Sequence, residues 1–105
     1  MELPLPVRRT VGFAFRFAQA GVKHDGAKPL KGFKGAGVLE IVEDFDGNTY
    51  RAVYTVKLEG VVYVLHCFQK KSKKGIATPK ATLDLIEQRL RVAQALHAER
   101  SKPHE

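Results

Sequence analysis

Hydrophobic residues recur at two different spacings along this chain, and the spacing separates helices from strands. Between Val7 and Ala20 they recur at intervals of three and four residues, which predicts a helix. Ala81–Ala98 shows the same spacing over a longer stretch and predicts a second helix. Three apolar stretches between them, bounded by turns that contain glycine, predict strands over Val38–Phe45, Thr49–Lys57 and Val61–Phe68.

The order of these elements predicts the fold class. A helix, three antiparallel strands and a second helix fit an α+β domain, in which a small twisted sheet of three to four strands carries both helices on one face. We expect the other face to be open to solvent or to a partner. Lys23–Gly37 is rich in glycine and lysine and is interpreted as a connection, and residues 100–105 as a frayed tail. At 105 residues the chain is predicted to be a single domain.

The turn between the last two strands predicts which side chains share a face of the sheet. If Glu59-Gly60 is a two-residue hairpin turn, Arg51 pairs with Phe68, and alternation places Arg51, His66 and Lys70 on one face. The opposite face is more apolar, so we expect it to pack under the helices. That predicted core face carries Tyr50, Ala52, Tyr54, Val56 and Leu58 with Val61, Tyr63, Leu65 and Cys67.

The turn between the first two strands predicts where the acidic residues lie. With Gly47-Asn48 as the turn, Asp44 falls opposite Arg51 and Glu40 falls opposite Thr55, on the open face. Since side chains alternate along a strand, a slip of one residue would reverse these assignments.

The charge of the chain indicates an anionic partner. The formal net charge is +7 and the isoelectric point is about 9.8, which favours nucleic acid or the ribosome. Residues 69–80 carry five lysines and no acid, directly after the last predicted strand. The candidate RNA-binding residues are Lys57, Lys71, Lys73, Lys74 and Lys80.

The single cysteine and the lack of a long apolar run limit the class of protein. Cys67 has no partner for an internal disulfide and is interpreted as a buried, small hydrophobic residue. No apolar run approaches the length of a membrane span, and no signal peptide is visible. We therefore expect a cytoplasmic protein.

The residue types on the predicted open face can perform phosphoryl transfer on RNA. His66 is the candidate acid or base for an attacking 2′-hydroxyl, and Arg51 and Lys70 are candidates for stabilising charge on the phosphate. This chemistry requires no metal or cofactor, and the four histidines have no zinc-ligand spacing. The simpler alternatives are a packed strand histidine, an Arg51–Asp44 ion pair and a solvated lysine loop.

Three segments together carry a family resemblance: residues 27–41, 47–54 and 62–72. They contain a Tyr-Arg-Ala-Val-Tyr strand and a Leu-His-Cys-Phe strand, followed by the Lys-Lys-Ser-Lys exit and a later Thr-Pro-Lys. This combination resembles the RelE/ParE toxin superfamily and in particular its phage-derived, HigB-like branch. The resemblance extends from about Val7 to Ala93, which is most of the chain.

The resemblance implies the toxin of a type II toxin–antitoxin pair, which cuts mRNA on the ribosome without a cofactor. It implies a cognate antitoxin of the helix-turn-helix type that holds the toxin inactive. Arg51 matches the strand arginine that stabilises the scissile phosphate in relatives, and the lysines that match their second basic group are Lys70, Lys71, Lys73 and Lys74. The alternative is a binding protein of the same fold without catalysis, such as a ParE-like gyrase inhibitor or a degenerate phage protein.

The chain departs from the family pattern in three places. Relatives carry basic residues on the strand before the Tyr-Arg strand, where this chain has Glu40, Glu43 and Asp44. The tyrosine or histidine that some relatives hold near the final helix is missing around Thr78 and Pro79. Relatives also begin with an extra strand, so we expect an unpaired sheet edge here that takes up a second copy or an antitoxin strand.

Overall fold

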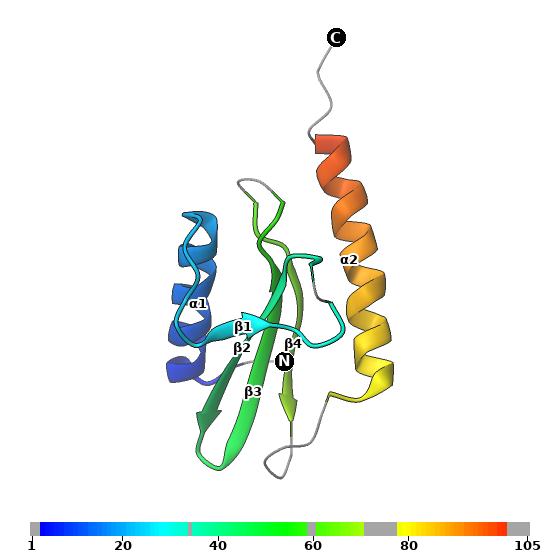
Figure 1. The fold of residues 1–105 in the computed structure, drawn as a ribbon. Coiled ribbons are helices and arrows are strands. Elements are labelled where there is room, and N and C mark those ends of the chain that lie inside the picture. Colours follow the sequence, from blue (N-terminus) through cyan, green and yellow to red (C-terminus); the bar gives the residue numbers. More distant parts are fainter. Residues whose placement is uncertain (1–2, 34, 59–60, 71–77, 101–105) are drawn as a thin grey trace.

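The computed structural model describes residues 3–33, 35–58, 61–70 and 78–100, and of Lys70 the backbone alone. It confirms the α+β class, with an N-terminal helix, an antiparallel sheet and a C-terminal helix (Figure 1). In chain order the elements are α1 (Leu5–Gln19), β1 (Ala27–Pro29), β2 (Val38–Phe45), β3 (Asn48–Thr55), β4 (Val64–Lys70) and α2 (Lys80–Arg100).

The sheet has the strand order β1-β2-β3-β4, and β1 is the strand that the sequence did not predict. It lies within the expected connection and pairs antiparallel with β2, from Ala27 opposite Ile41 to Pro29 opposite Leu39. Proline fits this position because an edge strand has a side on which no ladder hydrogen bond is donated. The prediction of an unpaired edge is therefore wrong beside β2 along these three residues.

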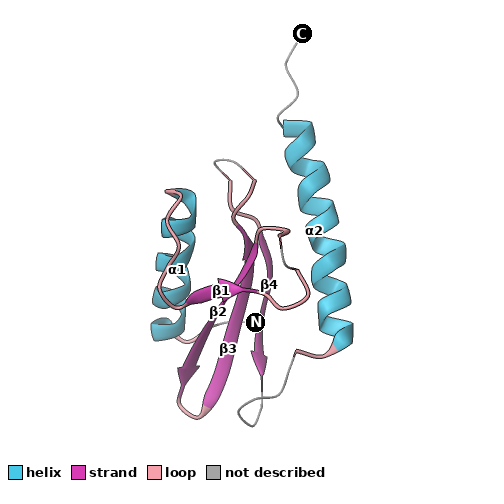
Figure 2. Cartoon of the chain, viewed as in Figure 1, coloured by secondary structure: helices cyan, strands magenta, loops and turns pink. Residues whose placement is uncertain are grey.

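The two helices pack on opposite faces of the sheet, so the prediction that both cover one face is wrong (Figures 1 and 2). On one face, α1 buries Val7, Val11 and Ala14 against side chains of β2 and β3 that include Ile41 and Tyr54. The ring of Phe15 meets the ring of Tyr54 edge to face, with 5.1 Å between centroids. This first core uses the face that the sequence predicted to be buried.

On the other face, α2 buries Ile86, Leu90 and Ala93 in a second core. The sheet contributes Val38 and Val53 to it. These valines lie on the face that carries Arg51 and His66, which the sequence argument treated as open because of its charged residues. The centre of this face is apolar enough to pack against the buried apolar residues of α2. The polar residues of the face lie around that centre.

The first hairpin turns one residue earlier than predicted, which shifts the pairing of its strands by two residues. Asp46 and Gly47 have φ values of 52° and 78°, the positive pair that a two-residue type I′ turn requires. The turn therefore pairs Glu40 with Val53 and Asp44 with Thr49. The predicted partners, Thr55 for Glu40 and Arg51 for Asp44, are wrong. Because the slip is of two residues, it leaves every side chain on its predicted face.

The register of the second hairpin is as predicted at one end and wrong at the other. Arg51 pairs with Phe68 as expected, and the pairing holds as far as Val53 opposite His66. Tyr54 then pairs with Val64, so one extra residue of β4 forms a β-bulge.

The bulge reverses the predicted faces of the residues before it. Tyr63 and Leu65 were expected beside Tyr54 on the α1 side, but both pack in the α2 core. Val62 packs against the α1 core instead. The physical reason is that one inserted residue shifts the alternation of a strand by one position.

Candidate functional site on the α2 face of the sheet

Arg51 forms an ion pair with a buried carboxylate of the neighbouring strand. Its Nη1 donates to Glu40 Oε2 at 3.0 Å, and only 19% of the Arg51 side chain and 6% of the Glu40 side chain are exposed. Asp44, the alternative partner suggested by the sequence, instead accepts a hydrogen bond from the Thr49 hydroxyl at 2.8 Å. The candidate phosphate-stabilising arginine is therefore held by a different acid.

A second cation stands on the far side of Glu40. Lys28 of β1 places its Nζ 3.8 Å from Glu40 Oε1, with 66% of its side chain exposed. The missed strand β1 brings this lysine into position, since Lys28 pairs directly with Glu40 in the ladder. Lys28 and Arg51 are two cations beside the single carboxylate of Glu40, so these three side chains together carry a net positive charge.

One donor of the Arg51 side chain is not used by the described residues. Its Nε is buried and has no hydrogen-bond partner among them, while Nη1 serves Glu40. An unpaired buried donor carries a free-energy cost that an incoming acceptor removes. A phosphate is the acceptor that matches two adjacent guanidinium donors.

Phe68 lies between Arg51 and His66. It is the direct cross-strand neighbour of Arg51, and its ring stacks on the imidazole of His66 with 4.9 Å between centroids and 22° between planes. Arg51 and His66 therefore share one face of the sheet, as the sequence predicted.

Arg89 of α2 completes this arrangement and was not predicted. Its Nη1 lies 2.9 Å from His66 Nδ1 and also donates to the Leu65 carbonyl at 2.9 Å. Leu65 is the bulged residue, so the irregularity of β4 supplies one of the two acceptors. We call Glu40, Arg51, Phe68, His66 and Arg89 the central cluster.

The contact with Arg89 fixes the proton of His66. A guanidinium only donates, so His66 Nδ1 must be the unprotonated nitrogen, and a neutral ring then carries its proton on Nε2. Burial lowers the pKa of His66 below its ordinary value of 6.5, and the charge of Arg89 lowers it further. In this arrangement His66 offers a hydrogen-bond donor at Nε2, and its proton-accepting nitrogen is occupied.

We expect Arg89→Gln to raise the pKa of His66 without restoring the ordinary value, because burial still disfavours the charged ring. An NMR titration of the imidazole resonances measures the change. Arg91→Gln is the matched control, since Arg91 on the same helix pairs with Glu87 at 2.9 Å and not with His66. Equal titration curves for both variants and the unaltered chain would contradict the contact.

The same lowered pKa gives a sign for the pH dependence of stability. The unfolded chain binds the proton of His66 more tightly than the folded chain does. His66 therefore makes the free energy of unfolding fall as the pH falls below about 6.5, and Arg89→Gln should weaken this fall.

The candidate lysines whose backbone the structure describes lie at two opposite ends of the sheet. Lys57 lies beyond the end of β3, where its Nζ donates to the Gly35 carbonyl at 2.6 Å. Its stem occupies the space where a side chain at Gly37 would stand. Lys70 ends β4 and Lys80 begins α2, both at the opposite end of the sheet from Lys57 (Figure 1). Lys71, Lys73 and Lys74 lie outside the described residues.

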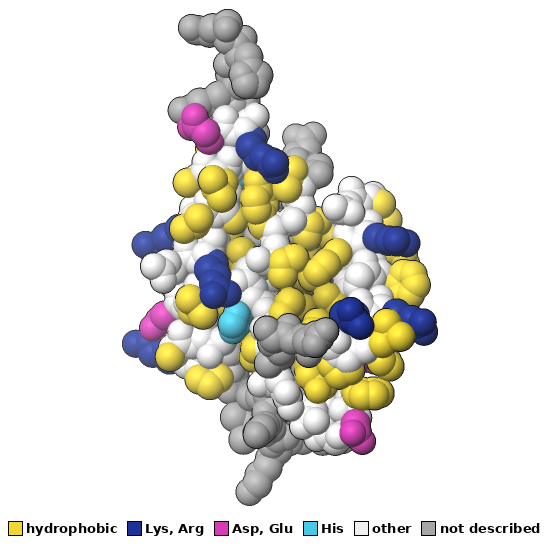
Figure 3. Space-filling view, turned by 180° about the vertical axis from the view of Figure 1, so that it is seen from behind, with side chains coloured by type: hydrophobic (Ala, Val, Ile, Leu, Met, Phe, Trp, Pro, Cys, Tyr) yellow, Lys and Arg dark blue, Asp and Glu magenta, His cyan; other side chains and the backbone are white. Residues whose placement is uncertain are grey.

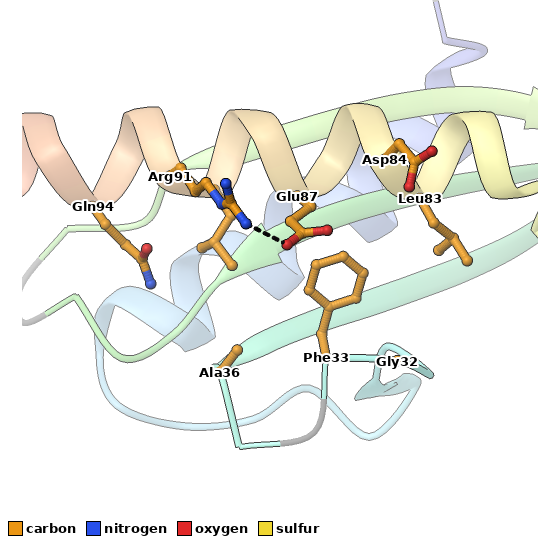
Figure 4. Close-up of a pocket in the computed structure, with 9 residues that line it drawn as sticks. Gly32, Phe33, Ala36, Leu83, Asp84, Glu87, Arg91 and Gln94 are labelled. Carbon is orange, nitrogen blue, oxygen red and sulfur yellow. Dashed lines mark hydrogen bonds and ion pairs between the residues drawn. The ribbon is translucent and has the colours of Figure 1, made fainter.

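A separate cavity lies between the loop after β1 and α2, away from the central cluster. It has a volume of about 410 Å³, and Phe33 points toward the helix between Leu83 and Glu87 (Figure 4). Its charged lining consists of Asp84, Glu87 and Arg91, of which the last two form the ion pair just described. Two carboxylates against one guanidinium make this cavity a poor site for phosphate.

The remaining thiol and the metal-binding residue types add no second site. Burial raises the pKa of Cys67, which packs against the α1 core as an inert hydrophobic residue. In the described part of the chain, no three His, Cys, Asp or Glu side chains come together as metal ligands.

The spacing of residues along α2 is a sequence signal that could have indicated Arg89. Arg89 stands three residues after Ile86 and four before Ala93, so helical spacing places it at the border of the buried stripe. A cation at that border faces the sheet. Glu40 was noticed as an acid on the same surface as Arg51, but its contact with Arg51 depended on the true position of the first turn.

Comparison with known proteins assigns the family. No curated protein and no solved structure matches the chain at a significant level. No helix in the described residues is long and apolar enough to span a membrane. The family described as "Phage derived protein Gp49-like (DUF891)" matches residues 1–91, which is most of the chain. The chain therefore belongs to the Gp49-like family of phage-derived proteins, a family of RelE/HigB-like toxins associated with toxin–antitoxin systems.

Proposed function

We propose that this chain is the toxin of a type II toxin–antitoxin pair and that it cuts mRNA on the ribosome. Arg51 binds the scissile phosphate through guanidinium donors that Glu40 does not occupy, and Lys70, two residues after the Arg51 partner Phe68 on β4, adds positive charge. His66, which the sequence predicted as acid or base, donates a hydrogen bond to the phosphate from Nε2, since a neutral ring with Nδ1 occupied does not give up its last proton. The observation that carries the proposal is the half-buried Arg51, whose Nε has no partner among the described residues.

A second candidate is a protein of the same fold that binds without catalysis. Two contacts favour it. The ion pair with Glu40 neutralises part of the charge of Arg51, and Arg89 occupies the nitrogen through which His66 would act as a base. A base for the 2′-hydroxyl is then missing from the central cluster, and binding is what its remaining donors support.

The antitoxin is proposed as a helix-turn-helix protein that holds the chain inactive. Within the described sheet, β4 is the long edge strand, and its Val64 is 49% exposed. An added strand at this edge, from the antitoxin or from a second copy, would satisfy its free backbone groups. We place the proposed homodimer at this edge, since β1 covers part of the other.

Induction in a bacterium, with and without the adjacent gene and with mRNA ends mapped, tests the proposal. We expect growth arrest with cleavage of translated mRNA, and suppression of both by the adjacent gene. Arg51→Gln combined with Glu40→Gln removes the guanidinium proposed to bind the phosphate. It also removes the buried carboxylate that would otherwise be left without a partner. It should reduce cleavage by roughly 10²-fold or more. Lys31→Gln, an exposed charge removed elsewhere, is the control. Growth arrest without cleavage would support the binding protein instead.

A further inference from the structure

The exposed face of α1 carries a basic surface that the central cluster does not include. Arg8, Arg9, Gly12, Phe13 and Arg16 line a hollow of about 250 Å³. We call these five residues the α1 arginine surface. Because α1 and α2 pack on opposite faces of the sheet, this surface lies on the other side of the molecule from the central cluster (Figure 1).

The three arginine charges of this surface are not neutralised by the described residues. None of those residues forms an ion pair with Arg8, Arg9 or Arg16, and α1 contains no acid. Arg51 and Arg91 differ in this respect, since each is paired with a glutamate. The positive charge of α1 is therefore available to an external anion.

An exposed aromatic ring stands among these charges. Phe13 is 52% exposed, and Phe17, one turn further along the helix, is 42% exposed. Figure 3 shows basic and hydrophobic side chains beside one another on the α1 side of the molecule. A large ring left in water next to guanidinium groups is suited to a ligand that is both anionic and flat.

Gly12 keeps the centre of the surface open. A Cβ atom added there would meet nothing within 4 Å, so packing does not require a glycine. A glycine inside a helix costs about 1 kcal/mol relative to alanine. Its effect here is a low floor between Arg8 and Arg16, which stand one turn before it and one turn after it.

We propose that the α1 arginine surface binds single-stranded RNA. Arg8 and Arg16 are separated by about 12 Å along the helix axis, since each residue rises about 1.5 Å. This distance suits two phosphates of one extended strand, with the base between them stacked on Phe13 over the floor at Gly12. Phosphate contacts combined with stacking on an aromatic ring are the usual means of holding single strands without sequence preference.

Two other occupants fit the surface less well. A helix that lies in a membrane interface keeps its cations on the face opposite its apolar residues, whereas α1 already buries its apolar face in the sheet and mixes Phe13 with the arginines. An acidic peptide would use the arginines but leave the flat face of Phe13 without a matching group. The binding experiment below therefore includes anionic vesicles, which represent a membrane, and polyglutamate, which represents an acidic peptide.

This inference rests on RNA as the ligand of the toxin but not on cleavage. Its test is binding of a short fluorescein-labelled single-stranded RNA to the full chain, between about 50 and about 200 mM salt. Arg8→Gln combined with Arg16→Gln removes two charges from the surface. Lys31→Gln combined with Arg100→Gln removes two exposed charges elsewhere and is the matched control.

The expected result is a loss of affinity for the α1 pair together with a shallower salt dependence. Two lost phosphate contacts reduce the slope of log K against log salt by about 1.4. The control pair should leave that slope nearly unchanged. Phe13→Leu should weaken binding about fivefold or more with no change of slope, because it removes stacking and no charge.

Three results would overturn the inference: equal effects of the two charge pairs, unchanged affinity for Phe13→Leu, or tighter binding of vesicles or polyglutamate than of RNA at equal charge. The outcome is separable from that of the proposed function. RNA binding through α1 without mRNA cleavage would reject only the nuclease. Cleavage with unchanged RNA binding in the α1 variants would reject only this surface.

Discussion

Arg51→Ala is expected to lower the free energy of unfolding by about 3 kcal/mol, as removal of one partner from a buried ion pair does. The loss arises at Glu40, which is 5% exposed and would lose its 3.0 Å partner. Lys28, at 3.8 Å, compensates in part, which places the expected loss at the lower end of the range for such pairs. Urea denaturation followed by circular dichroism measures it.

The double variant Glu40→Gln/Arg51→Ala should recover most of this loss, because it leaves no stranded charge. Lys28→Ala, which removes an exposed partner of the same carboxylate, should change stability by less than about 1 kcal/mol. Equal stability of Arg51→Ala and the double variant would show that Glu40 is not stranded. The comparison also matters for function, since loss of toxicity in Arg51→Ala alone could reflect unfolding.

Ile86→Ala is expected to lower the free energy of unfolding by about 3 kcal/mol, because Ile86 is fully buried where α2 meets the sheet. Leu96→Ala on the same helix is the control. Leu96 is 54% exposed, so its truncation removes little buried area and should change stability by less than about 1 kcal/mol. Thermal and urea unfolding of both variants provide the measurement.

A small effect of Ile86→Ala would contradict the two-sided packing of the sheet. If α2 were not seated on the face that carries Val53, the side chain of Ile86 would lie in solvent and behave like that of Leu96. The pair of variants therefore tests the correction to the predicted architecture as well as the size of one contact.

The parts of the fold that depend on local patterns could be predicted from the sequence. β2 begins and ends at the predicted residues, and the ends of α1, β3, β4 and α2 fall within three residues of the predicted bounds. Alternation correctly placed Arg51 and His66 on one face. Periodicity along the chain carries this information directly.

The parts that depend on nonlocal packing could not be predicted. β1 is only three residues long and ends in proline, so it has no periodicity of its own, and it exists because β2 offers an edge. The bulge at Leu65 has no local sequence signal, yet it reverses the faces of its neighbours. The face that α2 covers depended on whether Val38 and Val53 outweigh the charges around them.

In the candidate site, too, local patterns predicted the residues, whereas nonlocal packing determined their contacts. Residue types and alternation indicated Arg51 and His66, but their protonation and pairing are set by Glu40 and Arg89. These partners come from a strand pairing and from a helix that is distant in sequence. A sequence pattern can therefore nominate a charged residue, whereas its partner, which decides what the charge can do, comes from tertiary structure.

The two hydrophobic cores have no side chain in common, because each uses its own face of the sheet. Substitutions in different cores, such as Val11 beside α1 and Ile86 beside α2, should therefore change stability additively. Within the part of the chain that the structure describes, the two cores are linked through the backbone ladder of the strands. The family can then alter the α1 side and the α2 side in separate steps, since a change in one core does not require a compensating change in the other.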